Sequence, residues 1–251
     1  MSKIEIDLKR LLAAGVHFGH YKRRWHPAVA PYIHSVRNGR CIIDLTLTKQ
    51  ALEEALPIVS ETVAAGKSIL FVGTKYQAKE MVKEAAESVG MPYVTHRWVG
   101  GMLTNYTTIG IQIKKLKDLE KKMASGELAS KYNKLEVQNY QHEIDGLNLL
   151  YGGIKEMGLL PGMVFVSDMQ TNAIAVAEAN KLGLPLVALA DTNVDPRLAT
   201  YPIPSNDDAL QSLQLMIDLV VKAVKAGQAR VKPASPVPAG ANQKGEAGNE
   251  R

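Results

Sequence analysis

Short apolar runs and longer amphipathic stretches alternate along most of this chain. Each apolar run predicts a β-strand, and these runs lie at 41–44, 68–73, 92–95, 163–167, 186–190 and 201–203. The stretches with a helical period lie at 6–14, 48–65, 77–89, 172–182 and 207–226. Apolar strands separated by helices are typical of a parallel, doubly wound sheet with helices on both faces, so we expect an α/β fold.

Residues 107–151 depart from this alternation and predict a helical hairpin. The first half carries one apolar helical stripe: Ile109, Ile113, Leu116 and Met123. The second half carries a stripe with heptad spacing: Val137, Tyr140, Ile144, Leu147 and Tyr151. The stripes flank Ser125-Gly126, which favours an antiparallel coiled-coil hairpin whose helices extend roughly 20 Å from the sheet. The alternative is a pair of helices folded back onto the sheet domain.

Two further segments complete the predicted domain organisation. Residues 15–40 are rich in His, Arg, aromatic residues and Pro without a strand or helix period, so we expect an extended basic loop. Residues 228–251 are mostly Pro-, Gly- and Ala-rich without an apolar pattern, which predicts a disordered tail. The α/β sheet domain is then built from 1–106 and 152–227, with the hairpin 107–151 inserted between these two parts.

The distribution of charge points to a polyanionic partner. The chain has 251 residues, of which 46% are hydrophobic and 22% charged, and a net charge of +5. Residues 1–40 contain eight Lys and Arg against two acidic residues, and residues 96–122 contain six against two. Such clustering favours nucleic acid over a membrane as the partner, and a solvated basic face is the plainer alternative.

Cysteine usage and the N-terminus indicate the compartment. Cys41 is the only cysteine, which excludes an internal disulfide and fits a reducing compartment. No apolar run reaches the length of a membrane span. Glu5 and Asp7 interrupt the N-terminus where a secretory signal would be apolar, so we expect a cytosolic protein that binds no membrane.

A doubly wound sheet also suggests a nucleotide-binding enzyme, which the motifs do not support. Gly66-Lys67-Ser68 resembles the end of a phosphate-binding P-loop, but it precedes its strand, and Glu61 stands where that loop needs its first glycine. Residues 71–75 follow a strand but contain one glycine, not the three of a dinucleotide fingerprint. A backbone anion site at the next helix N-terminus stays open, whereas we expect neither enzyme activity nor a small-molecule substrate.

Histidine and carboxylate side chains near several predicted strand ends form a candidate metal site. The candidate ligands are His17, His20, Asp191, Asp207 and Asp208. Ligands bind at the carboxyl ends of parallel strands, and His together with carboxylates can hold a structural Zn²⁺ or Mg²⁺. In the alternative, Asp207 caps the last helix and Asp191 caps a turn. We expect no other cofactor.

Residues 95–105 bring together several groups that recognise nucleic acid. They include the cation of Arg97, the indole of Trp98, two glycines and the amide of Asn105. These groups can meet a phosphate, stack on a base and let a backbone approach closely. The alternative is a strand-to-helix turn in which the glycines satisfy the geometry, and the apolar neighbours of Trp98 favour an anchor in the protein.

Several motifs, in order along the chain, resemble those of one family. They are AGVHFGH (14–20), RRWHP (23–27), PYI (31–33), RNG (37–39), IIDL (42–45), ILFVGTK (69–75), RWVGGMLTN (97–105), GGIK (152–155), DTNVDP (191–196) and IPSNDDA (203–209). The chain is thus similar to small-subunit ribosomal protein two of bacteria and organelles from about residue 8 to residue 227. It departs from that family at His26, in the 168–171 turn, and in the few cations of the second hairpin helix.

The resemblance implies a flavodoxin-like sheet with an inserted coiled-coil hairpin, and a structural role on the ribosome of the cytoplasm or of an organelle. It implies binding to small-subunit ribosomal RNA at the junction of head and body, beside neighbouring small-subunit ribosomal proteins. It further implies help in attaching the mRNA-binding ribosomal protein one for translation initiation. A protein adaptor that does not touch RNA is the alternative. The expected RNA contacts are Arg10, Lys22, Arg23, Arg24, Trp25, Arg37, Arg97, Trp98, Asn105, Lys114, Lys115 and Lys117.

Overall fold

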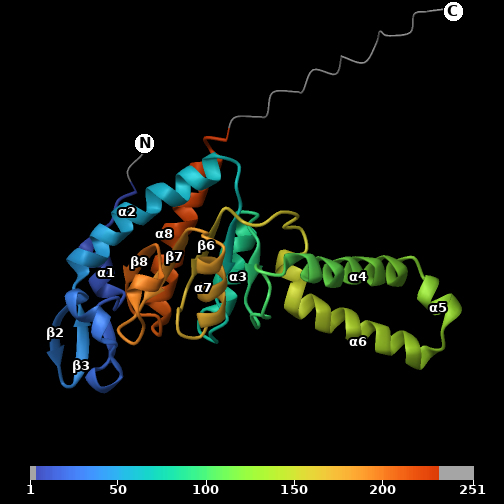
Figure 1. The fold of residues 1–251 in the computed structure, drawn as a ribbon, viewed down its shortest axis with the longest axis horizontal. Coiled ribbons are helices and arrows are strands. Elements are labelled where there is room, and N and C mark those ends of the chain that lie inside the picture. The colour runs from blue at the N-terminus through green and yellow to red at the C-terminus, as the bar shows by residue number, and fades with distance from the viewer. Residues whose placement is uncertain (1–3, 232–251) are drawn as a thin grey trace, which may run out of the picture.

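Five parallel strands form the central sheet of the computed structural model, which describes residues 4–231. In sheet order they are β5 (Tyr93–Val94), β4 (Ile69–Val72), β6 (Met163–Val166), β7 (Leu186–Ala190) and β8 (Tyr201–Pro204). Renumbered along the chain, the order is 2-1-3-4-5, which is that of flavodoxin-like sheets. The predicted doubly wound α/β class is therefore confirmed, and Figure 1 shows helices on both sides of the sheet.

The helices around the sheet follow the predicted alternation. They are α1 (Leu8–Ala13), α2 (Leu45–Ala64), α3 (Lys79–Ser88), α7 (Ala173–Lys181) and α8 (Leu210–Gln228). The last helix begins at Leu210 rather than at 207, because Asn206 accepts hydrogen bonds from the backbone N–H groups of Asp208 and Ala209 and so forms a turn before the helix.

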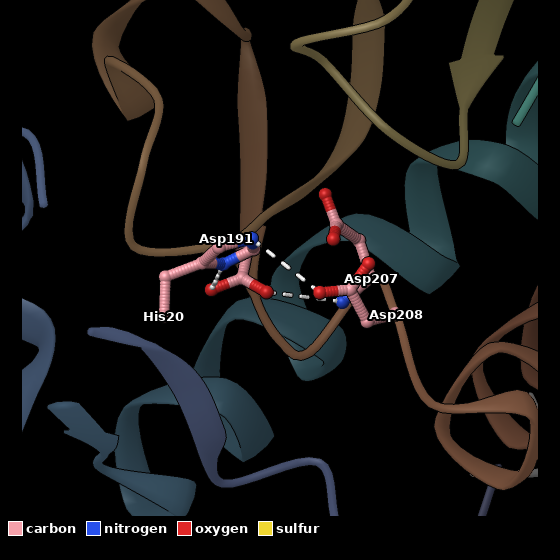
Figure 2. Close-up of side chains that lie close together, drawn as sticks. All are labelled: His20, Asp191, Asp207 and Asp208. Carbon is pink, nitrogen blue, oxygen red and sulfur yellow. Dashed lines mark hydrogen bonds and ion pairs between the residues drawn. The ribbon is translucent and has the colours of Figure 1, made fainter. Parts of the chain in front are cut away.

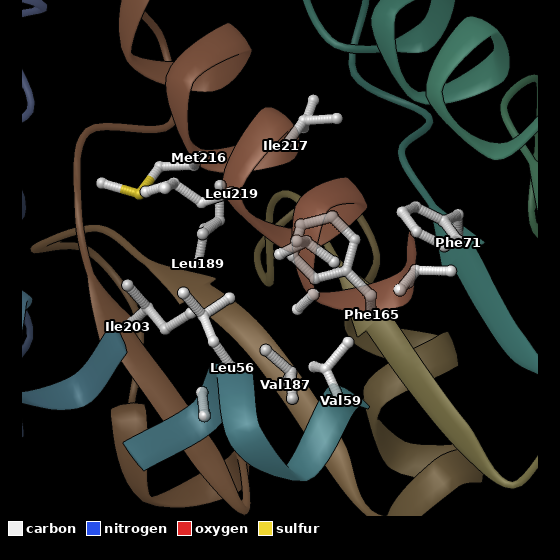
Figure 3. Packing of buried hydrophobic residues seen from close by; sticks show 14 of the residues in the cluster. Leu56, Val59, Phe71, Phe165, Val187, Leu189, Ile203, Met216, Ile217 and Leu219 are labelled. Carbon is white, nitrogen blue, oxygen red and sulfur yellow. The ribbon is translucent and has the colours of Figure 1, made fainter. Parts of the chain in front are cut away.

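Both faces of the sheet are buried, because successive strand residues point to opposite sides. Phe71 and Phe165 point into one apolar layer, which α2, α3 and α8 cover, and their rings pack edge to face with centroids 5.4 Å apart (Figure 3). Leu70 and Val164 point into the other layer, which contains residues of α7 and of the segment 98–119. The strands therefore lie in the core of the molecule.

The inserted segment forms two long helices joined by a short third helix. They are α4 (Tyr106–Ala124), α5 (Glu127–Lys131) and α6 (Lys134–Tyr151), and Figure 1 shows α4 and α6 side by side, extending away from the sheet. Ser125 and Gly126 follow the end of α4, where the two stripes separate, but α5 intervenes, and α6 begins only after the capping box of Asn133 and Glu136. Coiled-coil packing of this hairpin stays a prediction.

The predicted extended loop at 15–40 is instead ordered by a small antiparallel sheet. Its strands are β1 (Phe18–Tyr21), β2 (Ile33–Arg37) and β3 (Arg40–Ile43), in the order β1-β3-β2. The apolar run at 41–44 therefore belongs to this sheet and not to the parallel one. Asn38 and Gly39 both have positive φ, 49° and 75°, which is the geometry of a tight hairpin turn between β2 and β3.

The two remaining predictions concern membrane-spanning segments and the C-terminal tail. Within residues 4–231, no helix is long and apolar enough to cross a membrane. The predicted disordered tail falls mainly on 232–251, outside the described residues, and Gln228 is the last residue of α8.

Candidate nucleic-acid interface

The first group of candidate RNA contacts surrounds the antiparallel sheet. It contains exposed cations on α1, on β2 and in the turn after β1: Arg10, Lys22, Arg23, Arg24 and Arg37. Tyr21 in β1 is flanked by two guanidinium groups, of Arg23 at 5.8 Å and of Arg40 at 4.7 Å from the ring centroid. Arg40 is exposed and belongs to the same group, although it is not among the predicted RNA contacts. Trp25 is half-buried beside them.

The second group lies on α4 of the hairpin. Lys114, Lys115 and Lys117 are exposed there. Lys115 forms an ion pair with Glu143 of α6, and Lys117 forms one with Glu156 at 3.0 Å. Because exposed ion pairs are weak, about 0–1 kcal/mol, a phosphate can compete for these ammonium groups. The two groups lie at opposite ends of the molecule (Figure 1), so the structure does not bring them together.

The turn between β5 and α4 contains the third group, and it is built around a buried carboxylate. Trp98 is only 7% exposed, so its indole is closed to base stacking and anchors the turn, whereas Arg97 and Asn105 are exposed. The Glu178 carboxylate of α7 accepts hydrogen bonds from Trp98 Nε1 at 3.1 Å and from three backbone N–H groups of this turn. Hydrogen bonds to Glu178 therefore hold the turn against the sheet domain, while Arg97 of the turn is exposed to solvent.

Glu178 stays ionised because of these donors. Burial alone would raise the pKa of its carboxyl, but the hydrogen bonds from Gly101, Thr104, Trp98 and Leu103 outweigh burial and lower that pKa. This arrangement could not be predicted from the sequence, since a single Glu within a helix usually faces solvent.

An acidic cluster lies at the carboxyl ends of the parallel strands (Figure 2). It joins His20 of β1, Asp191 after β7, and Asp207 and Asp208 between β8 and α8. One ligand atom from each of these four residues lies within 4.8 Å of the others. His20 Nδ1 is 3.1 Å from Asp191 Oδ1, and His20 Nε2 is 3.4 Å from Asp208 Oδ2. Four of the five predicted metal ligands are therefore brought together.

His17, the fifth predicted ligand, lies outside this cluster. Its ring packs against Phe18 with centroids 4.0 Å apart. Residues three apart along an extended chain point to opposite faces, so His17 and His20 cannot share one site here. Asp207 is also not the helix cap of the alternative interpretation, since Asn206 accepts the N–H groups at that point.

Lys75, after β4, is the cation that faces the acidic cluster. Its Nζ is 2.7 Å from Asp207, 2.6 Å from Asp208 and 3.9 Å from Asp168. Burial and the neighbouring carboxylates Asp191 and Asp168 raise the pKa of Asp207 to about 8, even though Lys75 opposes this rise. For His20, the hydrogen bond to Asp191 raises the pKa. Lys75 is thus engaged by protein carboxylates, which weighs against a phosphate site at this strand end.

Comparisons with known proteins agree with the motifs and the fold. Residues 11–227 match the family described as Ribosomal protein S2. Proteins named "Small ribosomal subunit protein uS2" are similar in Roseiflexus sp. (47% identical, covering 90% of this chain and 86% of the relative) and in Rhodospirillum rubrum (48%, 88% and 84%). A third, from Syntrophobacter fumaroxidans, is 45% identical and covers 90% of this chain and 82% of the relative. Their names are those of ribosomal proteins, in line with the expected absence of enzyme activity. This chain belongs to the ribosomal protein S2 family.

Proposed function

We propose that this protein is a structural constituent of the small ribosomal subunit that binds ribosomal RNA at the junction of head and body. Family membership over residues 11–227 is the observation that carries this proposal. The exposed cations at both ends of the molecule support it, because a body with two separated basic surfaces can bridge distant RNA segments. Neighbouring small-subunit ribosomal proteins would complete its surroundings.

The proposed recognition relies on phosphates and RNA shape more than on base edges. The bases of folded RNA are mostly paired, and the deep groove of A-form RNA does not admit side chains. Exposed Lys and Arg neutralise phosphates and release counterions, so affinity falls as salt rises. Burial of Trp98 leaves Trp25, which is half-buried, as the remaining candidate for a stacking contact.

Charge reversal tests this proposal on the intact protein. Changing Lys114, Lys115 and Lys117 together to Glu removes three proposed phosphate contacts. Affinity is measured with a transcript of small-subunit ribosomal RNA. We expect the negative slope of log affinity against log salt to become shallower by about 2. The matched control reverses three exposed lysines on other helices, Lys181, Lys222 and Lys225. An equal effect of both triple variants, or none, would contradict the hairpin contacts and favour the adaptor without RNA.

We also propose that the protein helps to attach the mRNA-binding ribosomal protein one and so supports translation initiation. This part rests on the family resemblance. Small subunits assembled without this chain should retain little of ribosomal protein one after sedimentation, and adding the purified chain back should restore it. Full retention without this chain would refute the proposed attachment.

The acidic cluster supports the proposal of a structural divalent ion held by His20, Asp191, Asp207 and Asp208. Asp207 is 1% exposed, and its Oδ2 atom has no hydrogen-bond partner among the described residues, which fits a ligand atom. An imidazole nitrogen among the ligands favours Zn²⁺ over Mg²⁺. The ion would tie β1 to the ends of the parallel strands.

Calorimetric titration of metal-free protein with ZnCl₂ and, separately, with MgCl₂ tests this site. We expect one equivalent of Zn²⁺ to bind, and Asp207→Asn to abolish binding without loss of fold, because the amide keeps the size of the side chain but replaces a ligand oxygen with an NH₂ group. Asp195→Asn is the control, since Asp195 pairs with Arg197 outside the cluster. Equal binding by the wild-type protein and Asp207→Asn would contradict the site.

A further inference from the structure

Glu178 is a buried acid without a cationic partner among residues 4–231. It is 8% exposed, and no ion pair compensates its charge. Instead, all five hydrogen bonds to its carboxylate come from the turn before α4. Oε1 accepts from Trp98 Nε1 at 3.1 Å and Gly101 N at 2.6 Å, and Oε2 accepts from Leu103 N at 3.0 Å and from the N and Oγ1 of Thr104 at 3.1 Å each.

Convergent backbone N–H groups of this kind form a concave anion site, and here the anion belongs to the protein itself. Gly101 adopts a φ of 91°, a conformation that glycine permits and that side chains disfavour. The carboxylate comes from α7 of the sheet domain, and Glu178 lies 75 positions after Leu103 in the sequence. The position of the turn therefore depends on a residue that is distant along the chain.

The same turn also has residues exposed to solvent. Arg97 and Asn105 are exposed at its two ends, and Asn105 immediately precedes α4. We propose that Glu178 is a positioning residue for RNA: it holds the turn so that Arg97 and Asn105 meet the sugar-phosphate backbone of a folded RNA. This inference rests on the proposed function and adds a residue that does not itself touch the ligand.

A double-mutant cycle separates positioning from mere stabilisation. Arg97→Ala and Glu178→Gln are measured singly and together for binding to a transcript of small-subunit ribosomal RNA, at a temperature where circular dichroism shows every variant folded. If Glu178 acts through the turn, each single change weakens binding about tenfold and the double change does no more, because the second change has nothing left to remove. Additive losses, about 100-fold in the double variant, would overturn positioning.

Thr104→Ala provides a milder variant in case Glu178→Gln does not fold. It removes one of the five hydrogen bonds from an exposed position. We expect faster hydrogen exchange at Gly101 and Leu103 together with weaker RNA binding. Faster exchange with unchanged RNA binding would overturn the inference. Absence of RNA binding by the wild-type protein would instead refute the proposed function, and the inference with it.

Discussion

Leu116 is the position at which packing of the hairpin can be tested most sharply. It is 0% exposed on α4 and belongs to the same buried cluster as Ile144 of α6 and Val164 of the central sheet. Leu116→Ala removes its isobutyl group and leaves a cavity that the two facing helices cannot fully close. Substitutions of this kind lower the free energy of unfolding by about 2.7–5 kcal/mol. The matched control is Leu135→Ala on α6, which is 67% exposed and should change stability by less than about 0.5 kcal/mol.

Urea unfolding followed by circular dichroism measures both variants, and hydrogen exchange resolves where stability is lost. We expect one cooperative transition shifted to lower urea in Leu116→Ala, with faster exchange in both 106–151 and the central strands. A loss below about 1 kcal/mol would refute a packed seam between α4 and α6. Faster exchange confined to 106–151 would show that the hairpin opens by itself and does not share the core of the sheet.

Three further predictions address other contacts. Gly227→Ala should destabilise the protein by about 1–3 kcal/mol, because a Cβ atom would lie 2.5 Å from the Ser60 carbonyl oxygen. Gly110→Ala in α4 should stabilise it by about 0.5–1 kcal/mol, because the added Cβ atom meets nothing within 4 Å. Equal thermal shifts of both would contradict this. Lys75→Met, in metal-free buffer, should lower the free energy of unfolding by about 3–5 kcal/mol, because Asp207 and Asp208 lose the cation that pairs with them. Chemical denaturation measures this loss. Glu178 has a lowered pKa, so its contribution is present above the unfolded pKa of about 4.3 and disappears as the pH falls through the folded pKa. Acid unfolding should therefore be less steep in Glu178→Gln, and an unchanged profile would contradict an ionised Glu178 in the folded protein.

The parallel sheet was predictable because its strands are buried on both faces. Runs such as 69–72 and 163–166 are apolar at every position, and a short continuous apolar run is typical of a strand in a parallel sheet covered on both faces. The small antiparallel sheet was missed because the sequence of β2, IHSVR, does not alternate between apolar and polar residues, and most of its residues are exposed. The Asn38-Gly39 pair was the available signal, since both residues adopt positive φ in the turn between β2 and β3.

The candidate sites were predictable where their residues follow strand ends. They were not predictable where contacts between distant segments determine the role of a residue. Asp191 and Asp207 could be joined from the sequence, because parallel strands end at one edge of the sheet. Lys75 faces the same edge, but its role as a counterion needs the strand order. Glu178 lies within a helix, and only packing of α7 against the distant turn reveals that its carboxylate is buried.

Sedimentation of the tagged protein from a cell lysate, through a sucrose gradient at moderate magnesium, is the decisive test of a structural role in the small ribosomal subunit. We expect the protein to move with the small ribosomal subunit and to leave it after a high-salt wash or ribonuclease treatment, because its proposed contacts are to RNA phosphates. Sedimentation only as a free monomer would contradict a structural role in the subunit.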